Sequence, residues 1–539
     1  MVAPLASASL RRVNNDEKEN ENTTAQSEPA EFSGGFPVDF DRCSARHQLH
    51  EVCESILEFC ENSRSQDFDT FEGSLMARVR LLGRLFIAYF LWNRHQCFDH
   101  ESYARSHPGG RFKIASSRSL KCVFGELTYW RCYYERVSGG GCFPLDLALG
   151  LFADGFTPKV ISLVTRLATR MSYRSAHLIC KLFLGWAPAQ RTIAELVLDL
   201  GGHACHYMEQ VPPPVRSSPS EIVVVEIDGK ATPTATDQEL KKRRGKRSAK
   251  KSCRCCQRHR GKACRQRRGK RKRKKKGDKT KNGRSATIVA VYTLRRGEDG
   301  KLHGPENKRI WASYAPRKVM LDWAKAEVEK RGFQADGSDV HVLSDGEVAL
   351  NQGLEKRFPN ASMALDIRHV EEKIWSVGRL YYKEASTQLE DWVEKQRKVL
   401  YEGNTELLLK RLRRMLKAVP AKGPGTKKKR EQLNAVINYI EKRTQWMNYG
   451  ELQKQDLVIA TGVIEGAARY VIGERMDCSG MRWIDERAEM LLRLRCIDLN
   501  GEWDQFFDWT YSKIKQDQIQ NSKAYRLRSK QPQPLPKAA

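Results

Sequence analysis

The sequence predicts an α/β fold built on a mixed β-sheet and preceded by a mainly helical N-terminal domain. Two observations predict it. Residues 221–383 alternate between short hydrophobic strands and amphipathic helices, whereas residues 37–211 carry apolar side chains mostly at helical spacing. With 539 residues, 40% of them hydrophobic, the chain is long enough for two or three folded domains.

The N-terminal stretch, residues 1–36, is polar and acid-rich and has no hydrophobic core of signal-peptide length. We therefore expect a disordered leader. The domain that follows, residues 37–211, is expected to be helical except at Cys122–Tyr134, where the pattern predicts a strand pair or a strand and a turn. The break at residues 138–141 follows.

Residues 172–201 predict two helices joined by a tight turn. Gly185 is placed to end the first helix, Pro188 lies near the start of the second, and Gly201 is placed to follow its end. Such a pair fits a DNA-binding helix-turn-helix, and it fits equally well two core helices of an all-α domain.

A proline- and serine-rich linker at residues 212–220 separates this domain from the predicted sheet. Three strands, a helix, and then alternating strands and helices follow, which is the order of an RNase H-like fold with a mixed sheet. The expected strands are 221–227, 286–294, 309–314, 340–343 and 362–366, and the expected helices are 317–330, 348–358 and 370–382.

Two insertions interrupt this predicted core. Residues 231–285 form a basic insertion that contains Cys and His, and residues 384–455 show only helical patterns, which predicts an all-helical insertion. Residues 456–511 would complete the core, and residues 512–539 would form a flexible tail.

Three acidic residues carry the predicted chemistry. Asp228 and Asp345 each follow a hydrophobic strand, and Glu465 lies on a later helix. Strand ends of one sheet can bring two carboxylates together, and a helix packed across them can add the third. Carboxylate oxygens are the ligands that Mg²⁺ and Mn²⁺ prefer, and two such ions suit phosphoryl transfer. The alternative for each Asp is an ordinary Asp-Gly turn.

The charge of the chain predicts a polyanionic partner. The formal net charge is +30, and residues 241–276 contain 22 Lys or Arg and no acid. Such a tract binds phosphates without sequence preference, and double-stranded DNA is the expected partner. A nuclear-localisation signal is the alternative. We name as representative DNA-binding residues of this tract Lys241, Arg243, Arg244, Arg271 and Lys272. No apolar run is long enough to span a membrane.

The same tract holds a cysteine and histidine cluster. Four of its five members would suffice for a tetrahedral Zn²⁺ site, although the spacing is not that of a standard zinc finger. The alternative is a set of free thiols. The cluster consists of Cys253, Cys255, Cys256, His259 and Cys264. The other cysteines are scattered, as expected for reduced thiols in a cytosolic or nuclear protein.

Four further residues are candidate DNA contacts. Asp366 and His369 close a predicted strand and open a helix, and both are expected to contact DNA. His369 could contact a phosphate or a flipped base, or it could cap the helix. Arg482 offers a charge, and Trp483 offers either a stacking face for unpaired DNA or an anchor for the junction between two helices.

Taken together, these segments resemble the DDE-type transposases of bacterial insertion sequences. The motifs, in order, are IDGK, SDGE, LDIRHV and TGVIEGAARYVIGERMDCSGMRWIDERAEMLLRLRCIDLNGEW. The chain is most similar to the ISKra-type group and, more widely, to Mutator-like enzymes. The resemblance covers roughly residues 172–507, and residues 462–503 are its most specific part. Asp366 and His369 match the D-x2-H signature of such enzymes.

The resemblance implies an RNase H-like catalytic core with a helical insertion before the Glu, and Asp228, Asp345 and Glu465 as ligands of two Mg²⁺ ions. It also implies cleavage of element ends, transfer of the 3′-OH to target DNA, a homo-oligomer assembled on DNA, and a nucleoid-associated, cytoplasmic location. Two alternatives remain: a DNA-binding protein that has lost catalysis, and an RNase H-like nuclease without strand transfer.

Overall fold

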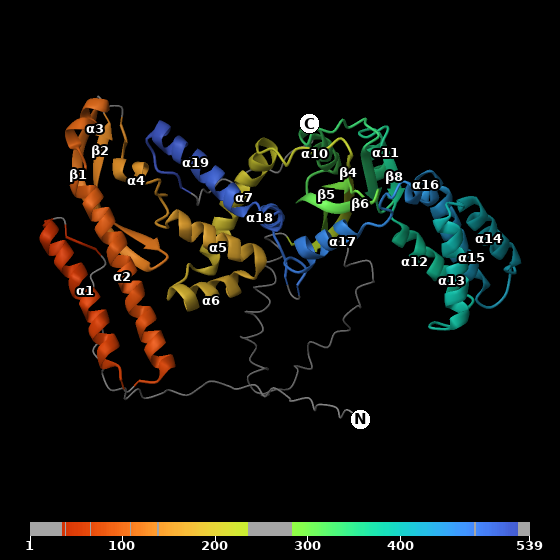
Figure 1. Ribbon diagram of the computed structural model, residues 1–539, viewed down its shortest axis with the longest axis horizontal. Coiled ribbons are helices and arrows are strands. Elements are labelled where there is room, and N and C mark those ends of the chain that lie inside the picture. The colour runs from red at the N-terminus through yellow and green to blue at the C-terminus, as the bar shows by residue number, and fades with distance from the viewer. Residues whose placement is uncertain are drawn as a thin grey trace, which may run out of the picture.

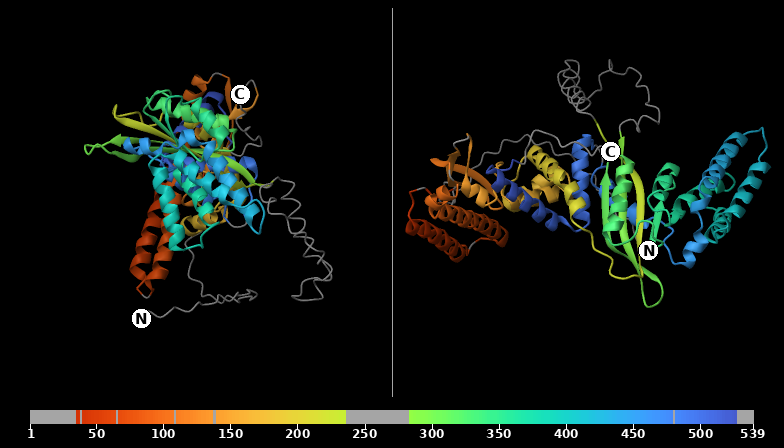
Figure 2. Two further views of the ribbon diagram at one scale, coloured as in Figure 1. Left: turned by 90° about the vertical axis from the view of Figure 1, so that its right-hand side faces the viewer. Right: turned by 90° about the horizontal axis from the view of Figure 1, so that it is seen from above.

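The computed structural model describes residues 35–526, apart from 38, 65, 108, 137–138, 236–282 and 479–480. The molecule is elongated. The N-terminal helices lie at one end, a five-stranded sheet lies in the middle, and a group of helices lies at the other end (Figures 1 and 2). Almost all of the expected leader, the basic tract and the end of the expected tail fall outside the described residues.

The N-terminal end is a helical hairpin packed against a small antiparallel sheet. Asp41 and Asp67 cap its two helices by accepting hydrogen bonds from the backbone N–H groups of Ser44 and Thr70. The sheet is longer than predicted, because its first strand begins at Gly110 and not within 122–134. The elements are α1 (Arg42–Asn62), α2 (Phe68–Gln96), α3 (His100–Ser106), β1 (Gly110–Cys122), β2 (Gly125–Arg136) and β3 (Gly141–Cys142).

Four helices connect this region to the central sheet: α4 (Pro144–Ala148), α5 (Pro158–Arg170), α6 (Tyr173–Leu184) and α7 (Gln190–Gln210). Gly185 ends α6 in the left-handed conformation, with φ 78°, as predicted. The expected helix end at Gly201 is wrong, because α7 continues past it. A Cβ atom at Gly201 would lie 2.6 Å from Cβ of Met490, so this glycine allows a later helix to approach closely.

The central sheet has five strands: β4 (Glu221–Pro233), β5 (Gly283–Arg296), β6 (Leu302–Ser313), β7 (Val340–Ser344) and β8 (Ser362–Leu365). Their order is β6-β5-β4-β7-β8. β4, β5 and β6 pair antiparallel, and β7 lies parallel to both β4 and β8. Three helices accompany it: α10 (Arg317–Lys330), α11 (Val348–Glu355) and α12 (Ile367–Gly378). The protein is therefore a mixed α/β protein with one mixed and one antiparallel sheet.

A helical segment follows α12 and has a hydrophobic core of its own. It contains α13 (Thr387–Tyr401), α14 (Thr405–Ala418), α15 (Thr426–Glu441), the short helix η3 (Thr444–Trp446) and α16 (Tyr449–Lys454). α12 packs against α13 and α15 and so joins this segment to the edge of the sheet. Figure 2 shows the segment set off from the sheet on the side opposite the N-terminal hairpin.

The chain then returns to the middle of the molecule through α17 (Gly462–Ala468), η4 (Arg469–Gly473), α18 (Asp485–Leu499) and α19 (Trp503–Asn521). α18 packs against α5, α7 and β6, so it ties the N-terminal half to the sheet. The expected flexible tail from residue 512 is wrong up to residue 526: α19 continues to Asn521, and the Tyr525 carbonyl accepts a hydrogen bond from the Ala153 N–H. None of the described helices has the length and apolar character needed to cross a membrane.

Candidate active site

Asp228 and Asp345 lie on neighbouring strands at the same level. The parallel pairing of β4 with β7 ends at Ile227 and Ser344, and the two aspartates are the next residues along their strands. Because neighbouring strands lie about 4.8 Å apart, their backbones are adjacent. One expectation was wrong: β4 does not end at Asp228 but continues to Pro233, paired with β5. Asp228 therefore lies at the point where β4 is no longer paired with β7 but is still paired with β5.

The loop after β7 has a backbone that requires glycine. Gly346 has φ 79°, and a Cβ atom there would lie 2.2 Å from Cδ1 of Leu365. Helix α15 and the turn that follows it hold this loop. Tyr439 on α15 donates its hydroxyl to the Asp345 carbonyl at 3.5 Å, and Nε of Arg443, two residues after the helix ends, donates to the Gly346 carbonyl at 2.5 Å. The helical segment thus supports the backbone of one site residue.

Glu465 lies in the first turn of α17, which packs across β4 and β5. A buried acid holds this helix in place. Glu226 accepts a hydrogen bond from the Ile464 N–H at 2.7 Å and another from the Tyr292 hydroxyl at 2.7 Å. Because alternate residues of a strand share a face, Glu226 lies on the same side of β4 as Asp228.

The sequence pattern did not lead us to predict a role for Glu226, although a signal existed. It is an acid inside the hydrophobic strand EIVVVEID, two positions before Asp228. In the folded protein it has no exposed surface. Burial raises the pKa of Glu226 to about 7, and the hydrogen bonds from Tyr292 and Ile464 only partly oppose that shift.

The three predicted acids share one electrostatic environment. Burial raises the pKa of Asp228 above its ordinary value, and the negative charges of Asp345 and Glu465 raise it further. A hydrogen bond from the Gly229 N–H and the nearby His369 act in the opposite direction. A cation among these carboxylates would relieve their repulsion.

In this structure the three carboxylates are not directed at one common point. Asp228 Oδ1 accepts from the Gly229 N–H at 2.6 Å, and Asp345 Oδ1 accepts from the Glu347 N–H at 3.0 Å. Glu465 is exposed. Among the described residues, no group of three or more His, Cys, Asp or Glu side chains has a metal-holding arrangement. The donor set nevertheless fits Mg²⁺ or Mn²⁺, because it consists of carboxylate oxygens alone.

Asp366 is fully buried and caps α12, where its Oδ1 accepts from the Arg368 N–H at 2.9 Å. Its other oxygen accepts from the hydroxyl of Thr461, the residue that precedes α17. The helix cap considered for His369 is thus supplied by Asp366, and as a buried carboxylate Asp366 does not contact DNA in this arrangement. His369 is 38% exposed, and its Nε2 lies 3.9 Å from Asp366 Oδ2.

Trp483 is buried, with 9% of its surface exposed. Its Nε1 donates to the Met476 carbonyl at 2.9 Å, its ring packs edge-on to Tyr173, and the guanidinium of Arg475 lies 5.0 Å from its centre. The structure thus has Trp483 in its packing role and not as a stacking face. Arg482 is exposed.

The second helix of the pair at 172–201 is also built into the core, whereas the first, α6, buries only Ala176 and Cys180. α7 packs against α5, α6, α18 and α19, and ten of its residues are buried. The basic tract and the whole Cys and His cluster lie outside the described residues, so their DNA-binding and zinc roles stay predictions.

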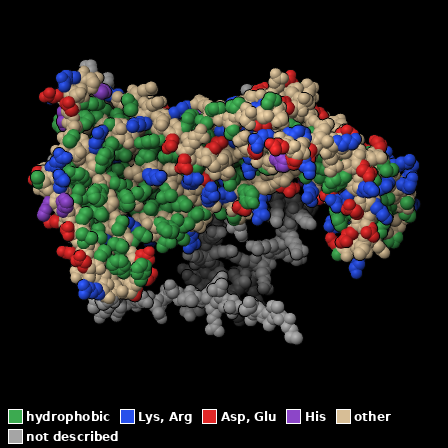
Figure 3. Space-filling model, in the orientation of Figure 1, with side chains coloured by type: hydrophobic (Ala, Val, Ile, Leu, Met, Phe, Trp, Pro, Cys, Tyr) green, Lys and Arg blue, Asp and Glu red, His purple; other side chains and the backbone are tan. Residues whose placement is uncertain are grey.

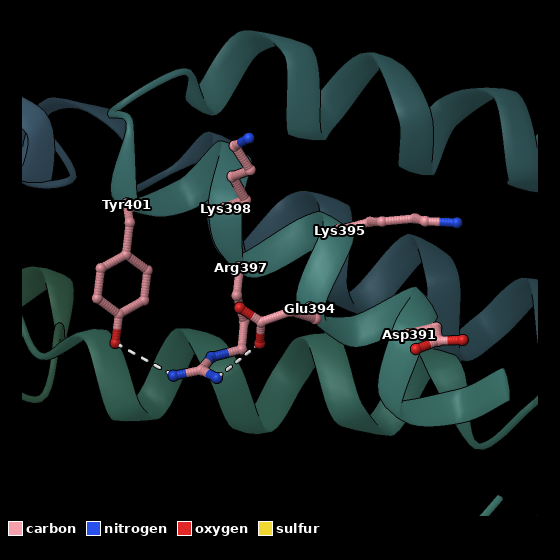
Figure 4. A pocket seen from close by; sticks show the side chains of 6 residues that line it. All are labelled: Asp391, Glu394, Lys395, Arg397, Lys398 and Tyr401. Carbon is pink, nitrogen blue, oxygen red and sulfur yellow. Dashed lines mark hydrogen bonds and ion pairs between the residues drawn. The ribbon is translucent and has the colours of Figure 1, made fainter. Parts of the chain in front are cut away.

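The helical segment carries a cavity of about 650 Å³ beside α13, far along the chain from the acids (Figure 4). Arg397 contacts Glu371 Oε1 at 2.7 Å, Glu394 Oε2 at 2.8 Å and the Tyr401 hydroxyl at 3.5 Å. Its lining has two acidic and three basic residues, and none of the acids of the candidate site is among them.

Comparison with protein-family models and with curated proteins finds no match to this chain.

Proposed function

We propose that this protein is a DDE-type DNA transposase, which cleaves the ends of an insertion sequence and transfers the 3′-OH to target DNA. The sheet order β6-β5-β4-β7-β8, with three antiparallel strands followed by two parallel ones, supports the expected RNase H-like core. The position of the helical segment, after α12 and before α17, supports its role as an insertion before Glu465.

One observation carries the proposal. Residues 228, 345 and 465 are far apart in sequence, yet the charges of Asp345 and Glu465 both act on the carboxyl of Asp228. Two adjacent strands and the first turn of a helix supply them. Carboxylates that repel one another destabilise a fold unless a cation or a proton is shared among them, so their assembly favours a metal-dependent function.

The carboxylates of Asp228, Asp345 and Glu465 would hold two Mg²⁺ or Mn²⁺ ions, which when bound activate the attacking oxygen and stabilise the leaving oxygen of a phosphodiester. The chain's own residues prepare this site. Glu226 fixes the start of α17, so that Glu465 is presented over β4. Asp366 joins the start of α12 to Thr461, and His369 on α12 is half-exposed near Asp228, where it can contact the DNA backbone.

The other expectations follow from this proposal. Double-stranded DNA, as element end and as target, is the partner that suits a net charge of +30. Assembly on two element ends requires more than one copy of the chain, and work on chromosomal DNA implies a nucleoid-associated, cytoplasmic location. Deleting residues 241–276 should weaken binding to all DNA sequences alike and flatten its salt dependence.

The test compares four variants in cleavage and joining of labelled DNA taken from either flank of the gene, with Mg²⁺. Asp228→Asn, Asp345→Asn and Glu465→Gln should each lose both reactions while DNA binding and unfolding stay normal. Glu474→Gln is the matched control, because Glu474 is the other acid nearby and pairs with Arg469 at 3.5 Å.

Each possible result of that test assigns the protein to one class. Cleavage without joining in the wild type identifies a nuclease. DNA binding with neither reaction identifies a transposase-derived binding protein. Loss of both reactions in Glu474→Gln, with Glu465→Gln active, would show that Glu474 is the third acid.

A further inference from the structure

A positively charged cavity of about 420 Å³ lies where the start of α6 meets the segment between η4 and α18. Four arginines line it, and no described Asp or Glu does. They are Arg174, Arg475, Arg482 and Arg487. Ser172, the N-cap of α6, lies at the same cavity and accepts from the Ser175 N–H at 3.0 Å. The partial positive charge of a helix N-terminus adds to that of the arginines.

Arg475 is the unusual member of this group, because it is a buried cation without an acidic partner. It is 1% exposed. Its Nε donates to the Ala168 carbonyl at 2.9 Å, but its buried Nη2 has no hydrogen-bond partner among the described residues. A buried charge of this kind is costly unless an anion pairs with it. Arg475 is one of the residues that line the cavity, and a guanidinium with an unpaired N–H is suited to a phosphate oxygen.

The cavity also lies beside the strand that carries Asp228. The Trp483 N–H donates to the Pro233 carbonyl at 3.1 Å, and the Ala235 N–H donates to the Trp483 carbonyl at 2.8 Å, so the cavity wall is paired with the end of β4. We propose that this cavity binds a phosphate group of the DNA backbone and so positions DNA relative to the acidic site. This inference rests on the proposed function.

The test uses the double variant Arg174→Gln/Arg487→Gln, which keeps Arg475 and changes side chains that are not buried. A short, fluorescently labelled DNA duplex is titrated at several salt concentrations. We expect binding to weaken about tenfold and the slope of log K against log salt to fall by about 1 to 2. The control is Arg105→Gln on α3, which should change neither quantity.

Thermal unfolding with inorganic phosphate distinguishes the source of the phosphate. If phosphate stabilises the wild type but not the double variant while DNA binding is equal in both, the cavity takes free phosphate and the DNA assignment is overturned. If neither measurement differs, the cavity binds no phosphate. Both measurements are independent of cleavage, so Asp228→Asn should behave as the wild type, and failure of the proposed function is recognised separately.

A second inference comes from α2, which carries apolar side chains on two opposite faces. Its inner face buries Leu81, Leu85, Ala88 and Trp92. Its outer face exposes Met76, Val79, Phe86 and Phe90 by 44%, 47%, 52% and 51%. Figure 3 shows hydrophobic side chains gathered over the half of the molecule that contains the N-terminal helices. A continuous apolar face of a helix is normally covered by another element or another chain.

These outer residues lie along one face of the helix, and we call this face the α2 stripe. It consists of Met76, Val79, Phe86 and Phe90, with Gly83 between them. The spacing of three and four residues is that of a coiled-coil seam. A Cβ atom at Gly83 would lie 2.6 Å from the ring of Phe124, so Phe124 from the β1–β2 turn fills the gap and keeps the stripe continuous.

The α2 stripe ends in opposite charges, with Glu72 four residues before Met76 and Arg94 four residues after Phe90. Both are exposed. The arrangement is symmetric about Gly83. Two copies of α2 that pack antiparallel about an axis near Gly83, with the Phe124 ring of each copy between the two helices, would therefore place Met76 against Phe90 of the other copy, and Glu72 against Arg94. We infer that the α2 stripe is a two-fold interface with a second copy of this chain, formed without DNA.

Sedimentation equilibrium of the full-length protein without DNA tests this interface. The wild type should be a dimer, and the double variant Phe86→Asp/Phe90→Asp should be a monomer. Glu72→Arg or Arg94→Glu alone should weaken dimerisation about tenfold, because each creates two like-charge contacts, and the double reversal should restore it. The control is Ile519→Asp on α19, where Ile519 is 54% exposed.

A monomeric wild type overturns the interface, and so does a double reversal that stays as weak as the single ones. The charge variants alter only exposed side chains, so loss of folding does not obscure the result. Cleavage of a single DNA end is measured in parallel and reports on the acidic site alone.

Discussion

Replacing Glu226 should show that a buried, neutral carboxylic acid holds the helix of the candidate active site. In Glu226→Gln, the amide oxygen can accept from the Ile464 N–H and the amide nitrogen can donate to the Tyr292 hydroxyl, so the side chain copies protonated Glu. In Glu226→Leu both contacts are lost, and the buried N–H of Ile464 has no acceptor. That loss should cost about 1–3 kcal/mol of the free energy of unfolding.

The pH dependence separates the two variants from the wild type. The pKa of Glu226 is about 7 in the folded protein and 4.5 ordinarily. Between these pH values the folded protein holds a proton that the unfolded chain has released, so this group destabilises the fold as the pH rises. Over this pH range the group lowers the free energy of unfolding by about 3 kcal/mol. We therefore expect Glu226→Gln to gain up to that amount relative to the wild type between pH 4.5 and 8.

The assay is denaturant unfolding at several pH values, without divalent metal. Other titrating groups are common to all three proteins and cancel in the differences. Parallel stability profiles for the wild type and Glu226→Gln would falsify the assignment of a buried neutral acid. In DNA cleavage, Glu226→Gln should stay near wild type and Glu226→Leu should fall, because α17 loses its anchor.

Three further outcomes are expected. Trp483→Ala should lower the free energy of unfolding by about 3–5 kcal/mol, with DNA cleavage falling only in proportion to the unfolded fraction; unchanged melting with lost joining would contradict the packing role. Gly201→Ala should cost about 1–3 kcal/mol in thermal unfolding, because its Cβ would meet Met490 at 2.6 Å. Burial lowers the pKa of His203 and of His341 from the ordinary 6.5 to about 4. Between these pH values the unfolded chain binds more protons than the folded protein, so the free energy of unfolding should fall as the pH drops from 6.5 to 4. The fall, measured by denaturant unfolding, should be smaller in His341→Gln.

The local signals in the sequence located most elements but not their ends. Gly185 ended a helix as predicted, because a left-handed residue is needed there. Gly201 did not end its helix. It is a glycine because Met490 on α18, nearly 300 residues away, packs closely against it. Sequence patterns carry local propensities, whereas the close approach of two helices depends on partners that the pattern does not name.

The same difference between local patterns and contacts with distant residues explains which features of the candidate site the sequence could predict. The two Asp-Gly pairs were recognisable because each follows a hydrophobic strand, but the sequence could not show that β4 continues beyond Asp228, since that pairing depends on β5. Asp366 was expected to contact DNA, and Trp483 could be either a stacking face or a packing anchor, whereas both residues are buried. Their partners, Thr461 and Met476, come from the return of the chain after the helical segment, which local patterns do not reveal.

Glu226 shows why these buried groups matter for the proposed chemistry. A helix that presents Glu465 to two aspartates has to stay in place against the repulsion of three negative charges. The hydrogen bond from Ile464 to Glu226 anchors that helix to the strand that carries Asp228, two residues away. Because burial keeps Glu226 uncharged below about pH 7, the anchor adds no fourth negative charge there. The site is thus built from one group of acids that bear charge and a buried acid that does not.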